Sequence, residues 1–474
     1  MGSAKVQDQG VPSRATQYIA AFIVNLMAFA CGFSMGWPST AIPYLEGPDS
    51  PIPLTAEESS WVTSLLCLAA AFTTPFAGLL PDRIGRKKTG YLIAAFLIIC
   101  WILIIFAENV ISLYAARILS GISSVGVFVF APIYVVEISI DQVRGVLGTF
   151  VTILCNSGIA VAYVLGSVLT YEEVCYVNVS LPVIFIALFF WLPETPKYLV
   201  YSGKIEEAKK SLQWFRGNSY DITAELNEIK LSFATKDSLS PTLSFKEMFT
   251  SKVTIRGLFI VLVLGANQQL SGIYPVLSYT VTIFRESGSD ISPNLSAIIV
   301  GFLLVFGNII AIFLVERAGR RILLITSNSI MAISLISIGA FFYLKHIEAD
   351  VSSIGWLPVT SLSIYVIAQS IGVGPLLYTV LTEIISPKMR YIANTMCISL
   401  VWFLAFLGAK FFINIADLIG VYSTYWIFSV CCFIAMLIII FQLPETKGKS
   451  LDEIAKALEG KCKKRHNTYD LPNI

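Results

Sequence analysis

Apolar residues gather in runs of about twenty, separated by short polar segments. A helix of about twenty residues is long enough to cross the ~30 Å hydrocarbon core of a bilayer. The pattern predicts an all-α membrane protein with twelve spans. Their predicted bounds are 18–42, 59–80, 90–107, 112–136, 147–169, 180–193, 254–284, 295–315, 322–344, 358–386, 393–417 and 421–443.

The spans fall into two six-helix halves, 18–193 and 254–443, joined by a polar linker at 194–253. Short polar tails at 1–17 and 444–474 complete the chain. Within the linker, Ile205, Ala208, Leu212 and Phe215 recur at helical spacing, which favours short amphipathic helices under the membrane domain. A linker without regular structure is the alternative.

Composition narrows the function. Only 14% of residues are charged, against about 25% in soluble domains, which excludes a disordered chain, a nucleic-acid binder and an ordinary soluble enzyme. The two histidines, His346 and His466, lie outside the apolar runs, so a buried His-based metal site and a His-dependent hydrolase are excluded. We expect no enzyme activity, no cofactor, no metal and no obligate protein partner, with the lipid bilayer as the surroundings.

Charge at the loops predicts the orientation. Basic residues gather at alternate loops, as in Arg83 to Lys88 and Arg317 to Arg321, whereas Glu57, Glu58 and Glu172 occupy the opposite loops. Because Lys and Arg accumulate on the cytoplasmic side, we expect both termini and the linker in the cytoplasm.

The halves repeat each other. Asp82-Arg83-Ile84-Gly85-Arg86-Lys87 returns 234 residues later as Glu316-Arg317-Ala318-Gly319-Arg320-Arg321. Pro193-Glu194-Thr195 returns 251 residues later as Pro444-Glu445-Thr446. Two six-helix halves with the same charged motifs predict a pseudo-two-fold bundle with a binding site between the halves.

A third repeat places an acid seven residues before an arginine, as Glu137 before Arg144 and Glu383 before Arg390. Carboxylates and guanidiniums at helix ends can bridge neighbouring helices and so close the cytoplasmic face in one state. The alternative treats the basic residues as topology anchors. The residues of this predicted gate are Asp82, Arg83, Arg86, Glu137, Arg144, Glu194, Glu316, Arg317, Arg320, Glu383, Arg390 and Glu445.

Together these motifs resemble the sugar porter family of the major facilitator superfamily, in order and spacing over nearly the whole chain. Ser60-Trp61-Val62, Asn156 and Lys410 resemble the insect facilitated trehalose transporters within it. The other motifs that carry the resemblance are Pro132-Ile-Tyr-Val-Val-Glu137, Arg144-Gly145, Pro193-Glu-Thr-Pro-Lys197, Gln268-Gln269-Leu-Ser-Gly272 and Pro444-Glu-Thr-Lys-Gly448.

A sugar site needs amide or hydroxyl groups and aromatic rings. The resemblance implies that Gln268 and Gln269 bind sugar hydroxyls and that Tyr279 helps to close the outer gate. Gly272 and Pro275 follow the glutamines, and interrupted helices are where transporter sites form. The alternative role for the glutamines is hydrogen bonding between helices.

Span ten is interrupted by Gly372, Gly374 and Pro375, which predicts a hinge. Beyond it, Tyr378 stands where the family usually has Trp, and Trp402 matches a sugar-stacking Trp of the family. Both aromatic residues could instead be core packing.

Several positions depart from the glucose-transporting pattern of the family. Tyr274 replaces an Asn, Thr152 a Gln, Ser370 an acid, Leu304 an Asn and Ala405 a second Asn. We therefore leave open a hexose, a disaccharide or a less polar solute. The predicted substrate-binding set is Gln268, Gln269, Trp402, Tyr378, Tyr274, Asn156, Thr152 and Ser370.

Two charged residues lie inside predicted spans, and the surroundings of the first bear on whether transport is coupled to protons. Ser34 stands where proton-coupled relatives have an Asp, so Arg117 lacks its acidic partner and facilitated diffusion is implied. Lys410 is a functional candidate or a lysine that extends its side chain to the outer surface.

The sequence thus predicts a facilitative sugar transporter of the plasma membrane, with trehalose or a hexose as its solute. A non-transporting sugar sensor and a proton-coupled symporter are the alternatives. Asn178 and Asn294 begin acceptor sequons for N-glycosylation on the outer side.

Overall fold

Long helices fill the structure, a computed structural model that describes residues 13–48, 50–218, 220–238, 252–289, 291–387 and 389–460. The side chains of residues 233–238 and Glu316 lie outside this description. In the described part, twelve helical segments are long and apolar enough to cross a membrane. The predicted all-α membrane fold is confirmed.

The first half contains α1 (Ala15–Leu45), α2 (Ala56–Ala77), α3 (Leu79–Ile84), α4 (Arg86–Ile105), α5 (Val110–Ile138), α6 (Asp141–Gly148), α7 (Phe150–Val168) and α8 (Tyr171–Phe189). The second half contains α13 (Lys252–Leu270), α14 (Ile273–Ser278), α15 (Thr280–Ser287), α16 (Pro293–Ala318), α17 (Arg320–His346), η1 (Ser352–Ile354), α18 (Leu357–Ile371), α19 (Val373–Ile384), α20 (Arg390–Ile419) and α21 (Val421–Gln442).

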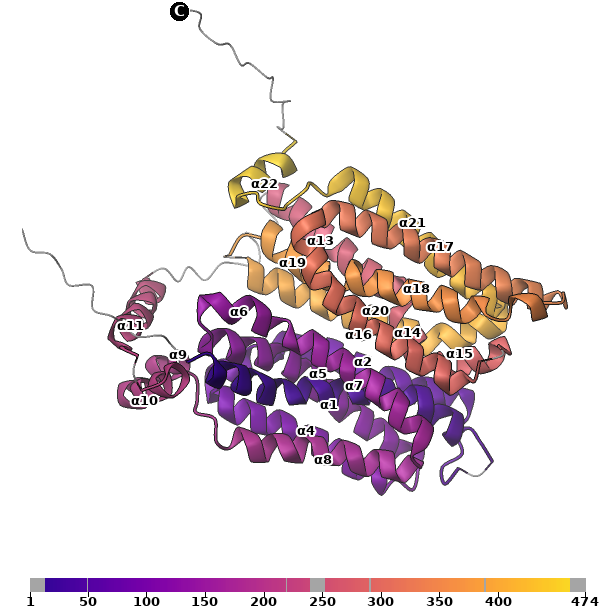
Figure 1. Cartoon of the computed structure of the whole chain (residues 1–474), viewed down its shortest axis with the longest axis horizontal. Coiled ribbons are helices and arrows are strands. Elements are labelled where there is room, and N and C mark those ends of the chain that lie inside the picture. The colour runs from indigo at the N-terminus through magenta and orange to yellow at the C-terminus, as the bar shows by residue number, and fades with distance from the viewer. Residues whose placement is uncertain are drawn as a thin grey trace, which may run out of the picture.

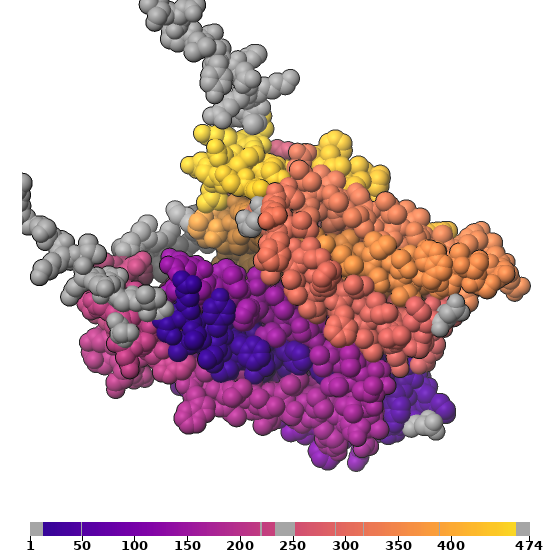
Figure 2. Space-filling view, viewed as in Figure 1, coloured from indigo at the N-terminus to yellow at the C-terminus, as the bar shows by residue number. Residues whose placement is uncertain are grey.

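Each half has its own apolar core, and the two lobes meet along the long axis of the molecule (Figures 1 and 2). Helices α2 and α20, α7 and α16, and α1 with α14 and α15 form the contact between them. Ile42, Ile159 and Tyr163 of the first half belong to the core cluster of the second. The halves therefore pack as two bodies across one interface.

Two of the predicted spans are divided. The segment predicted at 254–284 bends at Gly272, whose φ of 86° suits glycine and where a Cβ would meet the Phe428 ring at 2.3 Å. The segment predicted at 358–386 breaks at Gly372, between α18 and α19. There the Ser327 hydroxyl donates to the Ala368 carbonyl at 2.7 Å, which satisfies an acceptor at the break.

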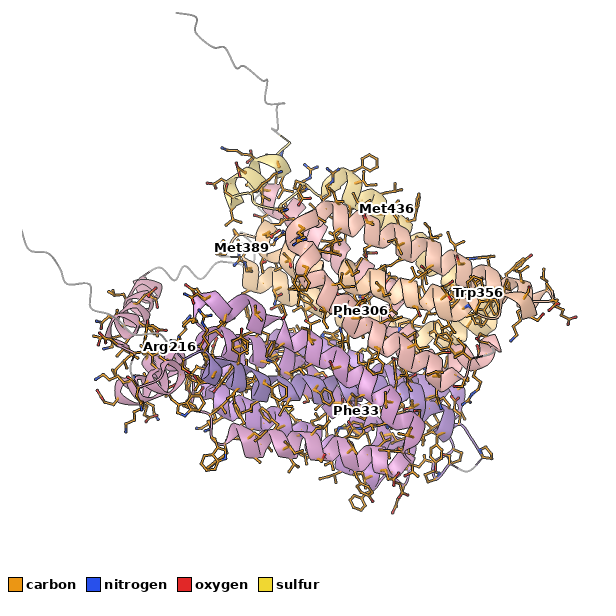
Figure 3. All side chains as sticks on the ribbon, in the orientation of Figure 1. Phe33, Arg216, Phe306, Trp356, Met389 and Met436 are labelled. Carbon is orange, nitrogen blue, oxygen red and sulfur yellow. The ribbon has the colours of Figure 1, made fainter. Side chains whose placement is uncertain are left out.

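The linker folds as α9 (Pro196–Tyr201), α10 (Ile205–Arg216) and α11 (Thr223–Ser238). Arg216, labelled in Figure 3, is buried and pairs with Glu225 while its Nη1 donates to the Ile138 carbonyl at 2.6 Å. The linker helices therefore rest on the first half. The short helix α22 (Leu451–Leu458) is bound to the second half, because Arg256 Nη1 of α13 donates to the Leu458 carbonyl.

Large apolar side chains cover the outside of the bundle. Phe306, labelled in Figure 3, is 54% exposed, and Phe72 and Phe76 are exposed as well. Apolar exposure on this scale is typical of a surface in contact with lipid.

Candidate solute site and charge clusters

The two ends of the helix bundle differ in whether their polar contacts join helices of one half or join the two halves. We call the end where α6, α19 and α22 lie the motif end, on the left in Figure 1, and the other the opposite end. All the repeated charged motifs lie at the motif end, because they stand where α3, α5, α16 and α19 finish and α4 and α17 begin.

In the first half, these residues form a compact cluster, the N-clamp: Asp82, Arg86, Glu137, Glu194 and Thr195. Arg86 Nη2 lies 2.8 Å from Glu137 Oε1 and 3.0 Å from Asp82 Oδ1. Thr195 donates to the second Glu137 oxygen at 2.6 Å. Glu194 accepts the backbone N–H groups of Lys87 and Thr195 at 2.9 Å. The N-clamp thus ties α4 to α5 and to the end of α8.

The second half repeats this arrangement in the C-clamp: Arg320, Glu383, Glu445 and Thr446. Arg320 Nη2 lies 3.0 Å from Glu383 Oε1, and Thr446 donates to the second Glu383 oxygen at 2.5 Å. Glu445 accepts four backbone N–H groups, those of residues 320, 321, 446 and 447, at 2.9–3.1 Å. Each of these bonds joins segments of the same half.

A glycine in each repeat makes this geometry attainable. Gly85 has a φ of 93° and Gly319 a φ of 86°, values that other residues rarely adopt. A Cβ at Gly85 would stand 2.6 Å from Glu194 Oε2, and one at Gly319 would stand 2.9 Å from Glu445 Oε2. The glycine therefore lets the carboxylate approach the first N–H groups of the following helix, where a negative charge is favourable.

The two clamps differ in how they are covered. In the N-clamp, Ser211 of α10 donates to the Glu194 carbonyl, and Arg86 lies over the Tyr198 ring. Burial raises the pKa of the Glu194 carboxyl above its usual range despite its two N–H donors. Burial also raises the pKa of Glu445, but its four N–H donors outweigh this, and the net pKa is lowered.

Other predicted gate residues lie outside the clamps. Arg144 pairs with Asp141 and donates to the Ser139 carbonyl, and Arg390 donates to the Thr382 carbonyl. The structure therefore does not pair either arginine with the glutamate seven residues before it. Arg83 and Arg317 are exposed. The side chain of Glu316 lies outside the described residues.

At the opposite end, hydrogen bonds cross between the halves. The Tyr163 hydroxyl of α7 donates to the Leu277 carbonyl of α14 at 2.6 Å. The Val281 backbone N–H of α15 donates to the Ser39 hydroxyl of α1 at 3.2 Å. Tyr279, the predicted outer-gate residue, is buried beside them; its hydroxyl donates to the Ala409 carbonyl at 3.2 Å, and its ring stacks on Phe412. This end is closed.

Lys410 reinforces that closure. It is only 5% exposed, and its ammonium contacts Glu57, Ser60 and Trp61 of the first half. The alternative of a side chain extended to the surface is therefore wrong for this structure.

Between the ends, three consecutive side-chain amides of α13 have buried polar atoms without a hydrogen bond. The Oε1 atoms of Gln268 and Gln269 are buried without a hydrogen bond, as are both side-chain polar atoms of the neighbouring Asn267. An unpaired buried polar group costs about 1–3 kcal/mol. Interhelical bonding, the structural alternative for the glutamines, is therefore not what these two acceptors do in this structure. We did not anticipate Asn267, although a third consecutive amide is visible in the sequence.

Aromatic residues of both halves meet near these amides. Tyr274 is buried in a cluster with Leu66 and Cys67 of α2 and with Phe406 of α20. Trp402 packs against the same cluster, and its ring centroid lies 6.4 Å from that of Phe128 on α5. Tyr274 and Trp402 therefore lie at the interface between the halves.

The remaining predicted binding residues differ in position. Tyr378 of α19 is 44% exposed. Asn156 is half-buried and Thr152 exposed. Ser370 is buried and faces α16, where a Cβ on Gly307 would lie 2.7 Å from its own Cβ. Ser370 thus packs within the second half, whereas Tyr378 is an exposed ring.

A family model supplies the decisive comparison. The model described as "Sugar (and other) transporter" matches residues 21–458. This chain belongs to the sugar transporter family.

Individual members of the sugar transporter family match along the same length. The chain is 37% identical over 458 residues to the facilitated trehalose transporter Tret1 of Bombyx mori, covering 96% of this chain and 90% of that protein. It is 36% identical over 457 residues to the facilitated trehalose transporter Tret1 of Polypedilum vanderplanki, with the same two coverages.

Solved structures show the fold of this family member. The inward open conformation of the xylose transporter XylE from E. coli superposes with a TM-score of 0.76 at 21% identity, over 93% of this chain and 98% of that one. Its partially occluded inward open conformation gives 0.75 at 21% identity, over 92% and 100%. The chain therefore has the major facilitator fold.

In this sugar transporter family member, Arg117 is fully buried in the first half. Its Nε donates to the Val62 carbonyl and its Nη1 to the Ser34 carbonyl, both at 2.9 Å, while Nη2 has no hydrogen-bond partner. The Ser34 hydroxyl lies 2.7 Å from that of Ser120. The groups that hold Arg117 are therefore carbonyls and a hydroxyl.

The two sequons differ. Asn178 lies inside α8, where it is fully buried and donates to the Val174 carbonyl at 2.9 Å. The sequon made a glycan possible here, but a fully buried side chain inside a helix does not suit one. Asn294 is exposed in the first turn of α16.

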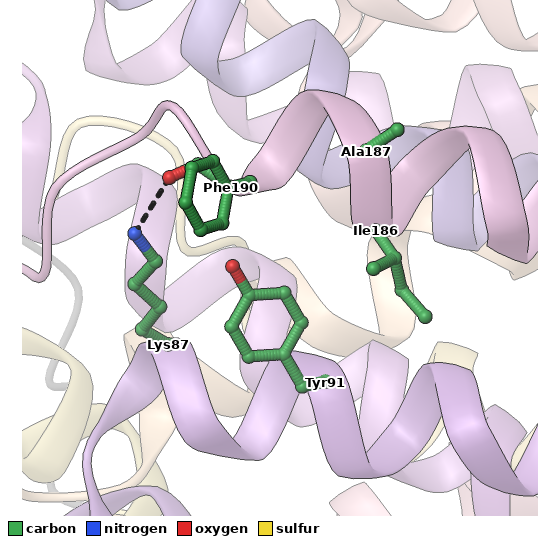
Figure 4. A pocket seen from close by; sticks show the side chains of 5 residues that line it. All are labelled: Lys87, Tyr91, Ile186, Ala187 and Phe190. Carbon is green, nitrogen blue, oxygen red and sulfur yellow. Dashed lines mark hydrogen bonds between the residues drawn. The ribbon is translucent and has the colours of Figure 1, made fainter.

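One shallow pocket lies away from the interface, between α4 and α8 (Figure 4). Lys87 borders it and donates to the Phe190 carbonyl at 2.9 Å and the Leu192 carbonyl at 2.6 Å. Tyr91, Ile186, Ala187 and Phe190 complete the lining. The predicted solute-binding residues do not line it, so this pocket is not the candidate solute site.

Proposed function

We propose that this protein is a facilitative transporter of the plasma membrane that moves a sugar, trehalose or a hexose, by alternating access. One observation carries the proposal. Bonds between the halves close the interface at one end, while the clamps at the other end bind each half only to itself. A molecule built this way can rock about its centre without breaking either half.

The unpaired amides support a polar solute. Gln268 and Gln269 present buried acceptor oxygens without partners, and a sugar offers several hydroxyl donors. Trp402 and Tyr378 supply rings that can stack on the apolar face of a sugar. The names of the two insect relatives favour trehalose, and the lost amides at positions 152, 274 and 405 favour a solute other than glucose.

Orientation follows from charge in this proposal. Basic residues at the motif end, such as Arg83, Lys88 and Arg317, favour the cytoplasmic side for that end. Both termini and the linker helices would then be cytoplasmic, and the closed opposite end would face outward.

The surroundings of Arg117 support uniport over proton symport. Proton coupling needs a group that gains and loses a proton near neutral pH. The carbonyls of Ser34 and Val62 and the Ser34 hydroxyl cannot do so.

Counterflow in proteoliposomes tests the proposed function. Vesicles preloaded with trehalose, glucose or xylose receive the same labelled sugar outside, without a proton gradient. We expect labelled trehalose or hexose to accumulate transiently, and Gln269→Ala to abolish this because it removes a binding acceptor. Gln213→Ala, in the linker helix α10, is the matched control and should exchange normally. Absence of exchange for every sugar by folded protein would contradict the proposal and favour a sensor.

A further inference from the structure

A single lysine holds three partners across the interface at the opposite end. Lys410 Nζ of α20 lies 2.5 Å from Glu57 Oε1 and 2.7 Å from Ser60 Oγ. It also stands 4.4 Å from the centre of the Trp61 ring, within the range of a cation–π interaction. All three partners belong to the first turns of α2, in the other half of the molecule.

This arrangement is costly unless the halves are together. The Lys410 side chain is 6% exposed, and a buried ammonium needs a compensating charge and hydrogen bonds. Each partner that supplies them comes from the first half, so separating the halves removes all of them at once. The contacts that compensate the buried charge therefore exist only in the closed arrangement.

A second lysine at the same end shows the contrast. Lys345 Nζ of α17 donates to the carbonyls of Glu286 and Ser287, the last two residues of α15 in its own half. Separation of the halves leaves those bonds intact. Lys345 is therefore a control of the same residue type at the same end.

We propose that Lys410, Glu57, Ser60 and Trp61 form a latch that sets how much of the time the opposite end is closed. The latch breaks each time that end opens and re-forms when it closes. This inference rests on the alternating access proposed above, but its test measures opening directly and requires no transported solute.

Because Lys410 is buried and Glu57 is exposed, we expect substitutions at the two residues to have unequal effects. Glu57 is 60% exposed in its side chain and stays hydrated when Lys410 is removed. Removal of Glu57 instead leaves a buried ammonium without its counter-ion, which penalises the closed state more strongly. We therefore expect Glu57→Gln to favour opening more than Lys410→Met does.

Cys67 reports opening. It is fully buried between the halves, in the cluster with Tyr274 and Ala405. The purified protein in proteoliposomes is treated with a membrane-impermeant maleimide, and modification of Cys67 is followed by peptide mass spectrometry. We expect Lys410→Met to raise the rate roughly fivefold, Glu57→Gln to raise it by up to about thirtyfold, and Lys345→Met to leave it unchanged.

The double variant sharpens the result. Glu57→Gln combined with Lys410→Met should return to the rate of Lys410→Met alone, because the unpaired ammonium is gone. Thermal unfolding identifies any variant that fails to fold, and the exchanged pair Glu57→Lys with Lys410→Glu then provides a second test by restoring slow modification. Folded variants with the rate of the native protein, or additive effects of the two substitutions, would overturn the latch. Loss of sugar exchange with the predicted Cys67 rates would instead contradict only the proposed solute.

Discussion

The motif end and the opposite end of the bundle use charges for different purposes. At the motif end, Arg86 with Glu137 and Arg320 with Glu383 fasten helices within one half. At the opposite end, Lys410 with Glu57 fastens one half to the other. The difference teaches that ion pairs at helix ends stiffen the moving bodies, whereas the bonds that must break and re-form are fewer and lie across the interface.

The largest expected effect comes from breaking a clamp. Glu383→Gln removes the carboxylate that pairs with the buried guanidinium of Arg320, and breaking a comparable buried pair costs about 3–5 kcal/mol. We expect a large loss of stability in chemical unfolding of the purified protein. Cys67 modification should stay slow, because the clamp does not join the halves.

Arg144→Gln is the control for that prediction, since its pair with Asp141 is exposed and surface pairs contribute about 0–1 kcal/mol. If Glu383→Gln instead left stability unchanged and accelerated Cys67 modification, the clamp would be a gate between the halves.

A smaller effect is expected from Tyr163→Phe. The substitution removes the hydroxyl that donates to the Leu277 carbonyl across the interface. One such bond contributes about 0.5–1.5 kcal/mol. The rise in the open population should therefore be several-fold smaller in Tyr163→Phe than in Glu57→Gln. Cys67 modification measures it. Tyr365→Phe, which loses a bond to Ser271 within the second half, should leave the rate unchanged; equal acceleration by both would contradict the assignment.

The smallest effect distinguishes the two clamps by pH. The lowered pKa of Glu445 means that its contribution to stability is present above the pKa of an unfolded glutamate, about 4.3, and is lost as pH falls through the lowered value. The raised pKa of Glu194 has the reverse sign: its contribution is present below about 4.3 and is lost as pH rises through the raised value.

Glu445→Gln should therefore lower thermal stability at pH 7, by less than about 1 kcal/mol because the group is partly exposed, and by progressively less on acidification. Glu194→Gln should be neutral or slightly stabilising at pH 7. The same loss from both substitutions at pH 7 would show that the covering helices do not distinguish the clamps.

Local signals were readable in the sequence because they depend on neighbouring residues. The breaks at Gly272 and Gly372, the helix α10 and the repeated Gly85 and Gly319 each follow from a short pattern. Bonds between distant segments were not readable. The repeat drew attention to Glu137 through its spacing to Arg144 without naming its partner, which in the structure is Arg86, because the packing of helices decides which charges meet.

The latch shows the same limit more sharply. Lys410 was visible as an unusual charge in an apolar span, but its partner Glu57 lies 353 residues away in the chain. Only the packing of α2 against α20 brings the two together. Unusual residues were therefore visible in the sequence before their partners were.

Paired distance measurements test the central claim most directly. One pair of spin labels would replace Ala56 and Ile415 at the opposite end, and another would replace Val146 and Ser386 at the motif end. With sugar present, we expect two distances at each end. The latch variants should increase the population of the longer distance at the opposite end and the population of the shorter distance at the motif end. Distances that lengthen together, or a single unchanged population at both ends, would contradict alternating access about this interface.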